Sequence, residues 1–159
     1  MIVYHGSTIE IRKPDLKHSR NNLDFGKGFY VTTFKDQAEK WALRKSVREN
    51  TSAIVNIYEI GDMEKFRVKT FDEAGSDWLN FVCDCRNGKS VASDYDVVIG
   101  NVADDEVIKC VRMYMRGIWD EARTIEEMKY YKQNDQIAFI NQAVIDEVVS
   151  FKDSYGVEE

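Results

Sequence analysis

Three short segments hold the residues best suited to chemistry in this chain. They are His5-Gly6-Ser7 near the N-terminus, a glycine-rich stretch that ends with Gly28 and Tyr30, and Trp41 further along. An imidazole can donate and accept hydrogen bonds, and glycine lets other atoms approach the backbone closely. Aromatic rings suit stacking on a flat cationic ring. Taken singly, each has an ordinary alternative, because such a histidine is often packed or solvated and such aromatics are often core.

Basic residues near the N-terminus offer a second kind of chemistry. Five of them fall within a few positions of one another: Arg12, Lys13, Lys17, His18 and Arg20. They suit a cradle for a diphosphate, and the ordinary alternative is a solvated loop. The chain as a whole has a net charge of −6 and a pI near 5.1, which disfavours broad attraction to DNA or RNA. Any basic rim is therefore local.

The cysteines do not suggest a metal site. Cys83, Cys85 and Cys110 are odd in number and lack CxxC spacing, and the chain has two histidines beside them. We expect reduced, mostly buried thiols and no metal. The sequence shows neither a signal peptide pattern nor an apolar run long enough to span a membrane, so we expect a cytoplasmic protein.

Hydrophobic patterns predict the strands that must position these residues. The expected strands are short and mostly apolar or alternating: 1–5, 28–33, 53–60, 65–71, 96–100 and 136–140. Between the first two lies a polar, aperiodic segment, 8–27, which is longer than an ordinary connection. We interpret it as a candidate binding loop.

Helical periodicity and capping residues predict the helices. They are expected at about 36–49, 77–86, 104–116 and 124–131, with a final helix after Asn141. Capping boxes are expected at Thr33 and Thr124, and simple caps at Ser76 and Asn141. On the first helix, Trp41 and Lys45 share a mostly apolar face. With 159 residues, no repeat and no linker, the chain is expected to be one α+β domain, residues 1–159.

The order of these motifs resembles that of a known enzyme family. His5-Gly6-Ser7, then the segment 25–30, then Ala38 and Trp41 closely resemble the poly-ADP-ribose-polymerase-like branch of the ADP-ribosyltransferases. The match is densest over 3–42 and resumes at 134–139. The whole chain resembles a small bacterial family of unknown function, a DUF, placed within this fold. The resemblance implies an α+β domain with a split β-sheet core and flanking helices.

The resemblance also implies roles for individual residues in binding NAD. His5 would hydrogen-bond the adenosine ribose with Ser7 nearby, and the backbone of Gly6 would contact the nicotinamide carboxamide. Tyr30 would stack on the nicotinamide, and Trp41 would close its other face. The expected cofactor-binding set is completed by two residues of the loop and its end, Arg20 and Gly28.

The implied reaction cleaves the nicotinamide–ribose bond of NAD, the substrate, and transfers ADP-ribose to a nucleophile or water without a metal. His5, Tyr30 and Gln136 would carry it. Gln136 stands where the polymerase-like enzymes have Glu, and Ala38 stands where they often have Ser. Glutamine cannot act as a base, so chain elongation is not expected. Asp135 and Glu127 are less well aligned substitutes.

The expected function is that of a bacterial mono-ADP-ribosyltransferase of toxin or effector type, acting on an unknown macromolecular acceptor and paired with an antitoxin-like protein partner. The first alternative is a catalytically inactive module that binds NAD or ADP-ribose. The second is a partner-binding module. Removal of an RNA 2′-phosphate is disfavoured because the acidic chain lacks a basic footprint.

Overall fold

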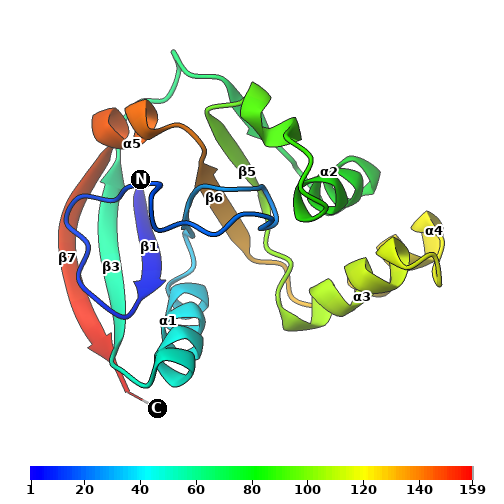
Figure 1. Ribbon diagram of the computed structural model, residues 1–159, viewed down its shortest axis with the longest axis horizontal. Helices are drawn as coiled ribbons and strands as arrows, with labels where there is room; N and C mark the ends of the chain where they lie inside the picture. The colour runs from blue at the N-terminus through cyan, green and yellow to red at the C-terminus, as the bar shows by residue number, and fades with distance from the viewer. Residues whose placement is uncertain (159) are drawn as a thin grey trace.

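Antiparallel pairing of three strands builds the first of two β-sheets in the computed structural model, which describes residues 1–158 (Figure 1). Its strands are β1 (Ile2–Ser7), β3 (Ala53–Ile60) and β7 (Val149–Val157), in the order β1-β3-β7. β3 is central because its alternating residues are rich in Ile, Val and Tyr and pack on both sides. A β-bulge lies between β3 and β7 near Ile57 and Tyr58.

The second sheet has four shorter strands in the order β2-β6-β5-β4. They are β2 (Phe29–Val31), β4 (Val68–Thr70), β5 (Val97–Asn101) and β6 (Asp135–Phe139). β4 runs parallel to β5, and the other neighbours are antiparallel. The mixed α+β fold class expected from the sequence is confirmed.

Strand alternation divides the core into layers. Ile137 and Phe139 of β6 pack into an apolar cluster shared by both sheets, which also contains Val3 and Tyr58. Ala138, which points to the opposite face, belongs to a second cluster built with the helices. A small third cluster joins the helix after β2 to the first sheet. Each sheet is therefore covered by helices on its outer face.

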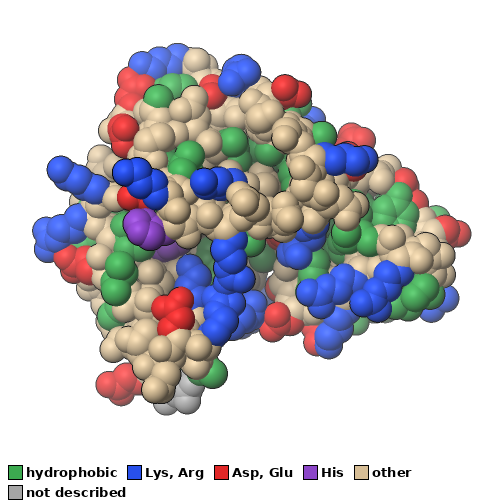
Figure 2. All heavy atoms as spheres, viewed as in Figure 1, with side chains coloured by type: hydrophobic (Ala, Val, Ile, Leu, Met, Phe, Trp, Pro, Cys, Tyr) green, Lys and Arg blue, Asp and Glu red, His purple; other side chains and the backbone are tan. Residues whose placement is uncertain are grey.

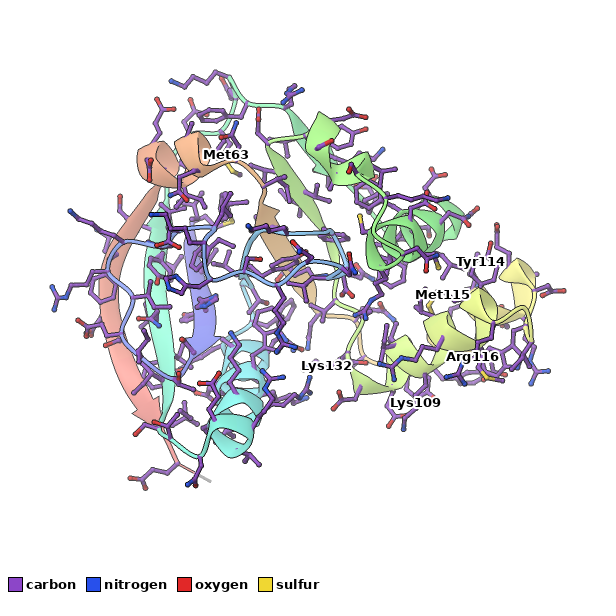
Figure 3. All side chains as sticks on the ribbon, viewed as in Figure 1. Met63, Lys109, Tyr114, Met115, Arg116 and Lys132 are labelled. Carbon is purple, nitrogen blue, oxygen red and sulfur yellow. The ribbon has the colours of Figure 1, made fainter. Side chains whose placement is uncertain are left out.

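The helices are α1 (Lys35–Glu49), α2 (Ser76–Arg86), α3 (Asp105–Met115), α4 (Glu121–Met128) and α5 (Gln142–Val148), with a 3₁₀ turn at Val91–Asp94. Figure 1 shows α1 beside β1, and α3 and α4 projecting from the opposite side of the molecule. In Figure 3, Tyr114 points from α3 toward α2, where its hydroxyl donates to Asn80 Oδ1 at 2.8 Å. Lys109 lies on the other side of the same helix.

Two expected capping boxes are wrong, because their threonines bind other groups. α1 begins after Phe34 with no side-chain cap, since the Thr33 hydroxyl donates to Asp135 Oδ2 at 2.5 Å. α4 begins earlier than expected, and Asp120 is its cap. Thr124 lies inside that helix and donates to the Asp120 carbonyl at 2.8 Å.

Other boundaries differ by a few residues, and one strand is new. β1 extends to Ser7, β2 is shorter than 28–33, β4 is shorter than 65–71, and β5 and β6 are each shifted by one residue. Ser76 is the first residue of α2, and Gly75 occupies its N-cap position without a side-chain bond. Asn141 does cap α5, accepting from the Ala143 amide at 3.0 Å. β7, which follows α5 directly, was not expected.

The remaining sequence expectations concern thiols, metals and membranes. Cys83, Cys85 and Cys110 are free and buried, as predicted. Across residues 1–158, no group of three or more His, Cys, Asp or Glu side chains is placed to hold a metal ion. In the same residues, no helix has the length and apolar character needed to cross a membrane.

Candidate functional site

The site predicted from the motifs lies where β1 and β2 separate. β1 is joined to Thr32, the residue that follows β2, by one isolated backbone bridge, in which Tyr4 N–H donates to the Thr32 carbonyl at 2.8 Å and Thr32 N–H donates to the Tyr4 carbonyl at 2.9 Å. In a continuing antiparallel ladder, the next bonded pair would be Gly6 and Tyr30. Instead, His5 Nδ1 lies 2.6 Å from the Tyr30 carbonyl oxygen. The split thus brings His5, Gly6 and Tyr30 together.

His5 is held as a neutral imidazole in one tautomer. Its ring packs on Phe29 with 4.5 Å between ring centroids. Burial, and secondarily the nearby Lys45 ammonium, lower the pKa of His5 to about 3, although the bond to the Tyr30 carbonyl opposes the shift. Because a carbonyl can only accept, Nδ1 must carry the proton. Nε2 therefore keeps its lone pair and can accept a hydrogen bond from a ligand hydroxyl.

Gly6 presents its backbone at the free edge of β1. The N–H and C=O groups of alternate strand residues point the same way, so those of Gly6, like those of Tyr4, point away from β3. The Gly6 carbonyl accepts from Lys45 Nζ at 2.9 Å. A Cβ atom at Gly6 would overlap the Ala38 carbonyl oxygen and lie 2.6 Å from the Ala42 amide nitrogen. The close approach that requires glycine here is that of α1.

Tyr30 anchors the end of the loop 8–27. Its hydroxyl donates to the Gly26 carbonyl at 2.5 Å and accepts from the Phe25 amide at 3.0 Å. Its ring stacks beside Phe25 with 6.5 Å between centroids. Burial, with the Asp24 charge as a second cause, raises the pKa of Tyr30 well above its usual range. The phenol stays protonated and holds the loop against the second sheet.

Gln136 lies on the same face of the second sheet as Ala138, the residue paired with Tyr30. Its side chain is 3% exposed. Its Nε2 donates to Asp24 Oδ2 at 2.9 Å and to the Asn101 carbonyl at 3.3 Å. Both amide hydrogens are therefore used inside the protein, and the side-chain oxygen is the group left to accept a bond from a ligand.

Asp24 is a buried hub that sequence reasoning missed. Its carboxylate forms an ion pair with Arg86, whose Nε donates at 2.9 Å, and accepts from the Ala103 amide at 3.0 Å and from Gln136. These bonds tie the loop to α2, to the end of β5 and to β6. One indication was present in the sequence, since Asp24 directly precedes the motif segment 25–30.

Trp41 and Ser7 flank the edge of β1. Trp41 is half-buried on α1 with its Cβ against Gly6, and the tryptophan fully buried in the core is Trp78. Ser7 is buried at the end of β1, opposite Ile54 in the sheet.

Arg20 lies in the loop 8–27, and Gly28 directly follows it. Gly28 is buried, and its N–H donates to Ser19 Oγ at 3.0 Å. Arg20 is exposed and close enough to Lys45 to influence its charge. Arg12 and His18 do not join it, because they pair with Glu10 and Asp15 respectively. The predicted basic cradle is thus divided.

Lys45 supplies a positive charge that the motifs did not indicate. Burial is the main cause that lowers the pKa of Lys45, and Arg20 and Arg48 lower it further. Figure 2 shows Lys and Arg side chains gathered where α1 meets the loop. A signal was present in the sequence, since Lys45 interrupts the apolar face of a predicted amphipathic helix.

Two hollows lie outside the split. One, of about 510 Å³, is bounded by the end of α1 and the end of β7, and one of about 450 Å³ lies between the loop and the segment 85–93. Neither is lined by His5, Gly6 or Tyr30. The split is therefore defined by hydrogen-bonding groups at a strand edge and not by either hollow.

Comparison with known protein families matches residues 1–151 to a family described as a protein of unknown function, DUF3990. No curated protein and no solved structure matches the chain. The family description names no activity, so a function must be argued from the groups in the split.

Proposed function

The chain belongs to the DUF3990 family, and we propose that it binds NAD in the split between β1 and β2 and transfers ADP-ribose to a macromolecular acceptor. The observation that carries the proposal is the free edge of β1 at Gly6, which lies beside the neutral His5 and the half-buried Trp41. The order of the motifs, which resembles that of the ADP-ribosyltransferases, supports the same assignment.

A carboxamide is complementary to the edge of β1. The N–H of Gly6 can donate to the carboxamide oxygen, and its carbonyl can accept from the carboxamide nitrogen. Trp41 lies next to that edge, and stacking of its ring on a cationic pyridinium contributes about 0.5–2 kcal/mol. Nicotinamide therefore suits this end of the split.

Ribose hydroxyls are complementary to the two remaining acceptors. His5 Nε2 can accept from one hydroxyl, and the Gln136 side-chain oxygen can accept from another without breaking the bonds of Gln136 to Asp24 and Asn101. These contacts orient the dinucleotide, and an acceptor oxygen near the reacting ribose stabilises positive charge that develops there.

The proposed reaction breaks the bond between C1′ of the ribose and the pyridinium nitrogen. Nicotinamide leaves as a neutral molecule with the electron pair of that bond. An oxygen or nitrogen nucleophile of the acceptor then bonds to C1′ and releases its proton to solvent. Because glutamine is no base, the proposal assigns the protein orientation and charge stabilisation rather than proton abstraction.

A binding module without turnover is the second candidate, and specific contacts favour it. Ala38 offers no hydroxyl to the carboxamide. Asp135, the carboxylate beside Gln136 in sequence, already accepts from the Thr32 and Thr33 hydroxyls. A module of this kind would retain saturable binding of NAD or ADP-ribose and recognise a protein partner, for which an antitoxin-like protein is one proposal.

Labelled NAD separates these candidates. The protein is incubated with labelled NAD and cell lysate, and transfer to macromolecules and nicotinamide release are measured while calorimetry measures binding. Trp41→Ala should weaken binding about tenfold, since it removes one stacked ring. Tyr130→Ala is the matched control, because this side chain is 78% exposed beyond α4.

Three outcomes are distinguished. Transfer that Trp41→Ala reduces and Tyr130→Ala does not supports the transferase. Saturable binding without transfer or nicotinamide release supports the binding module. Absence of binding at millimolar NAD would contradict both.

A further inference from the structure

A half-buried lysine, which forms no salt bridge within residues 1–158, lies inside the proposed NAD site. Lys45 reaches from α1 to the edge of β1, where its Nζ donates to the Gly6 carbonyl at 2.9 Å. An ammonium group has three donors, and one carbonyl uses one of them. Within residues 1–158, the Gly6 carbonyl is the partner that the protein gives this ammonium.

Its surroundings make this arrangement costly in the absence of an anion. Arg20 and Arg48 lie near enough to repel the ammonium, and burial opposes its charge. Glu49 is the carboxylate that attracts it, but Glu49 accepts from the Thr8 hydroxyl at 3.1 Å. Lys45 is half-buried and Arg20 and Arg48 are exposed, and a cluster of cations around a ligand site is suited to an anionic ligand.

Lys45 is bonded to a backbone carbonyl that the proposed ligand also uses. The Gly6 carbonyl is the acceptor proposed above for the nicotinamide carboxamide, and in the structure it is bonded to Lys45. The carbonyl oxygen has two lone pairs, and Lys45 already uses one of them, so a carboxamide that approaches this oxygen competes with the Lys45 ammonium for space and charge, and NAD binding favours movement of Lys45. The flexible four-carbon stem of lysine allows that movement without displacing α1.

We propose that Lys45 is an exchangeable cation: it bonds the Gly6 carbonyl in the free protein and moves to the diphosphate of the dinucleotide in the complex, together with Arg20. The inference rests on the proposed function, because it assigns the carboxamide to Gly6. It adds that the diphosphate of the ligand, and not the nicotinamide alone, draws Lys45 away from the Gly6 carbonyl.

The distinguishing consequence is an opposite effect on two fragments of NAD. Lys45→Met keeps the length of the stem and removes the charge. It should weaken binding of ADP-ribose, which carries the diphosphate, about tenfold, the loss expected for one charge-assisted hydrogen bond. Nicotinamide, which carries no phosphate, should bind at least as tightly, because the Gly6 carbonyl is released. Both affinities are measured by calorimetry on the full chain.

Three further variants test the role of charge. Lys45→Arg should keep ADP-ribose affinity within a few-fold. Arg20→Gln, at an exposed position, should weaken ADP-ribose binding and leave nicotinamide binding unchanged. Lys40→Met is the matched control, because Lys40 is exposed on the same helix, and it should change neither affinity.

The outcomes separate failure of this inference from failure of the proposed function. If the wild type binds neither fragment, both are refuted. If the wild type binds ADP-ribose and Lys45→Met leaves both affinities unchanged or lowers both equally, Lys45 only supports the structure and the inference alone is overturned. Should Lys45→Met not fold, Arg20→Gln and a salt titration of the wild type decide, since only ADP-ribose binding should weaken with salt.

Discussion

Acid should destabilise this protein through His5. In the folded state, burial and the Lys45 ammonium lower the pKa of His5 from 6.5 to about 3. The unfolded chain, with an ordinary histidine pKa, binds more protons between these values. Stability from this group is therefore present above pH 6.5 and is lost as the pH falls toward 3. Each pH unit in that window changes the free energy of unfolding by about 1.4 kcal/mol, which gives a loss of about 2.5 kcal/mol between pH 7 and pH 4.5.

Urea unfolding at pH 7 and pH 4.5, followed by circular dichroism, measures this loss. His5→Asn retains an N–H donor for the Tyr30 carbonyl but does not titrate. The stability of the wild type relative to His5→Asn should fall by about 2.5 kcal/mol between the two pH values. His18→Asn, at the other, exposed histidine, should follow the wild type. A difference between wild type and His5→Asn that is the same at both pH values would refute the neutral, half-buried state of His5.

Other predictions follow from single contacts. Gly6→Ala should lower the free energy of unfolding by about 2–3 kcal/mol, because its Cβ overlaps the Ala38 carbonyl; an unchanged melting temperature would contradict that packing. Asp24→Asn should cost about 3 kcal/mol in urea unfolding, since it leaves the partly buried Arg86 without its counter-charge. Tyr30→Phe removes two hydrogen bonds and should cost about 1–2 kcal/mol, with faster proteolysis of the preceding loop; equal digestion rates would show that the hydroxyl does not hold it.

Elements with strong local patterns were predicted well. The strand at 53–60 was predicted with its observed bounds, because a short run in which six of eight residues are apolar and rich in Ile, Val and Tyr leaves little ambiguity. The helix expected at 36–49 begins one residue earlier, at Lys35, and ends at Glu49. In both, the residues that determine the element lie within it.

Predictions failed where the structure of a segment depends on a partner that is distant in the sequence. A threonine before an apolar run is a sound capping signal, but the Thr33 hydroxyl binds Asp135 on another strand. β7 mixes charged, aromatic and glycine residues, so its own pattern is weak, and it is a strand because β3 offers an unpaired edge. Neither partner could be identified from local sequence.

The site shows the same division. His5 and Tyr30 were expected to lie together, and the His5 imidazole does meet the Tyr30 backbone carbonyl. The Tyr30 ring, which was expected to stack on nicotinamide, packs beside Phe25 instead. The expected reason for Gly6 was access for other atoms to the backbone, whereas the atoms that approach it are those of α1. Lys45 was noted only as a member of a helix face, because its bond to a strand edge depends on how α1 packs.

The isolated bridge between Tyr4 and Thr32 has a consequence for how ligands can be found. A ligand that contacts both sheets stabilises every state in which the bridge is closed, by about 2.7 kcal/mol at a hundredfold excess over its Kd. The amides of Tyr4 and Thr32 each donate to the carbonyl of the other residue. Their hydrogen exchange should then slow by about a hundredfold, provided that the local opening that breaks the bridge also releases the ligand. The exchange rates of these two backbone amides therefore report whether a ligand is bound, even when the acceptor and the reaction are unknown.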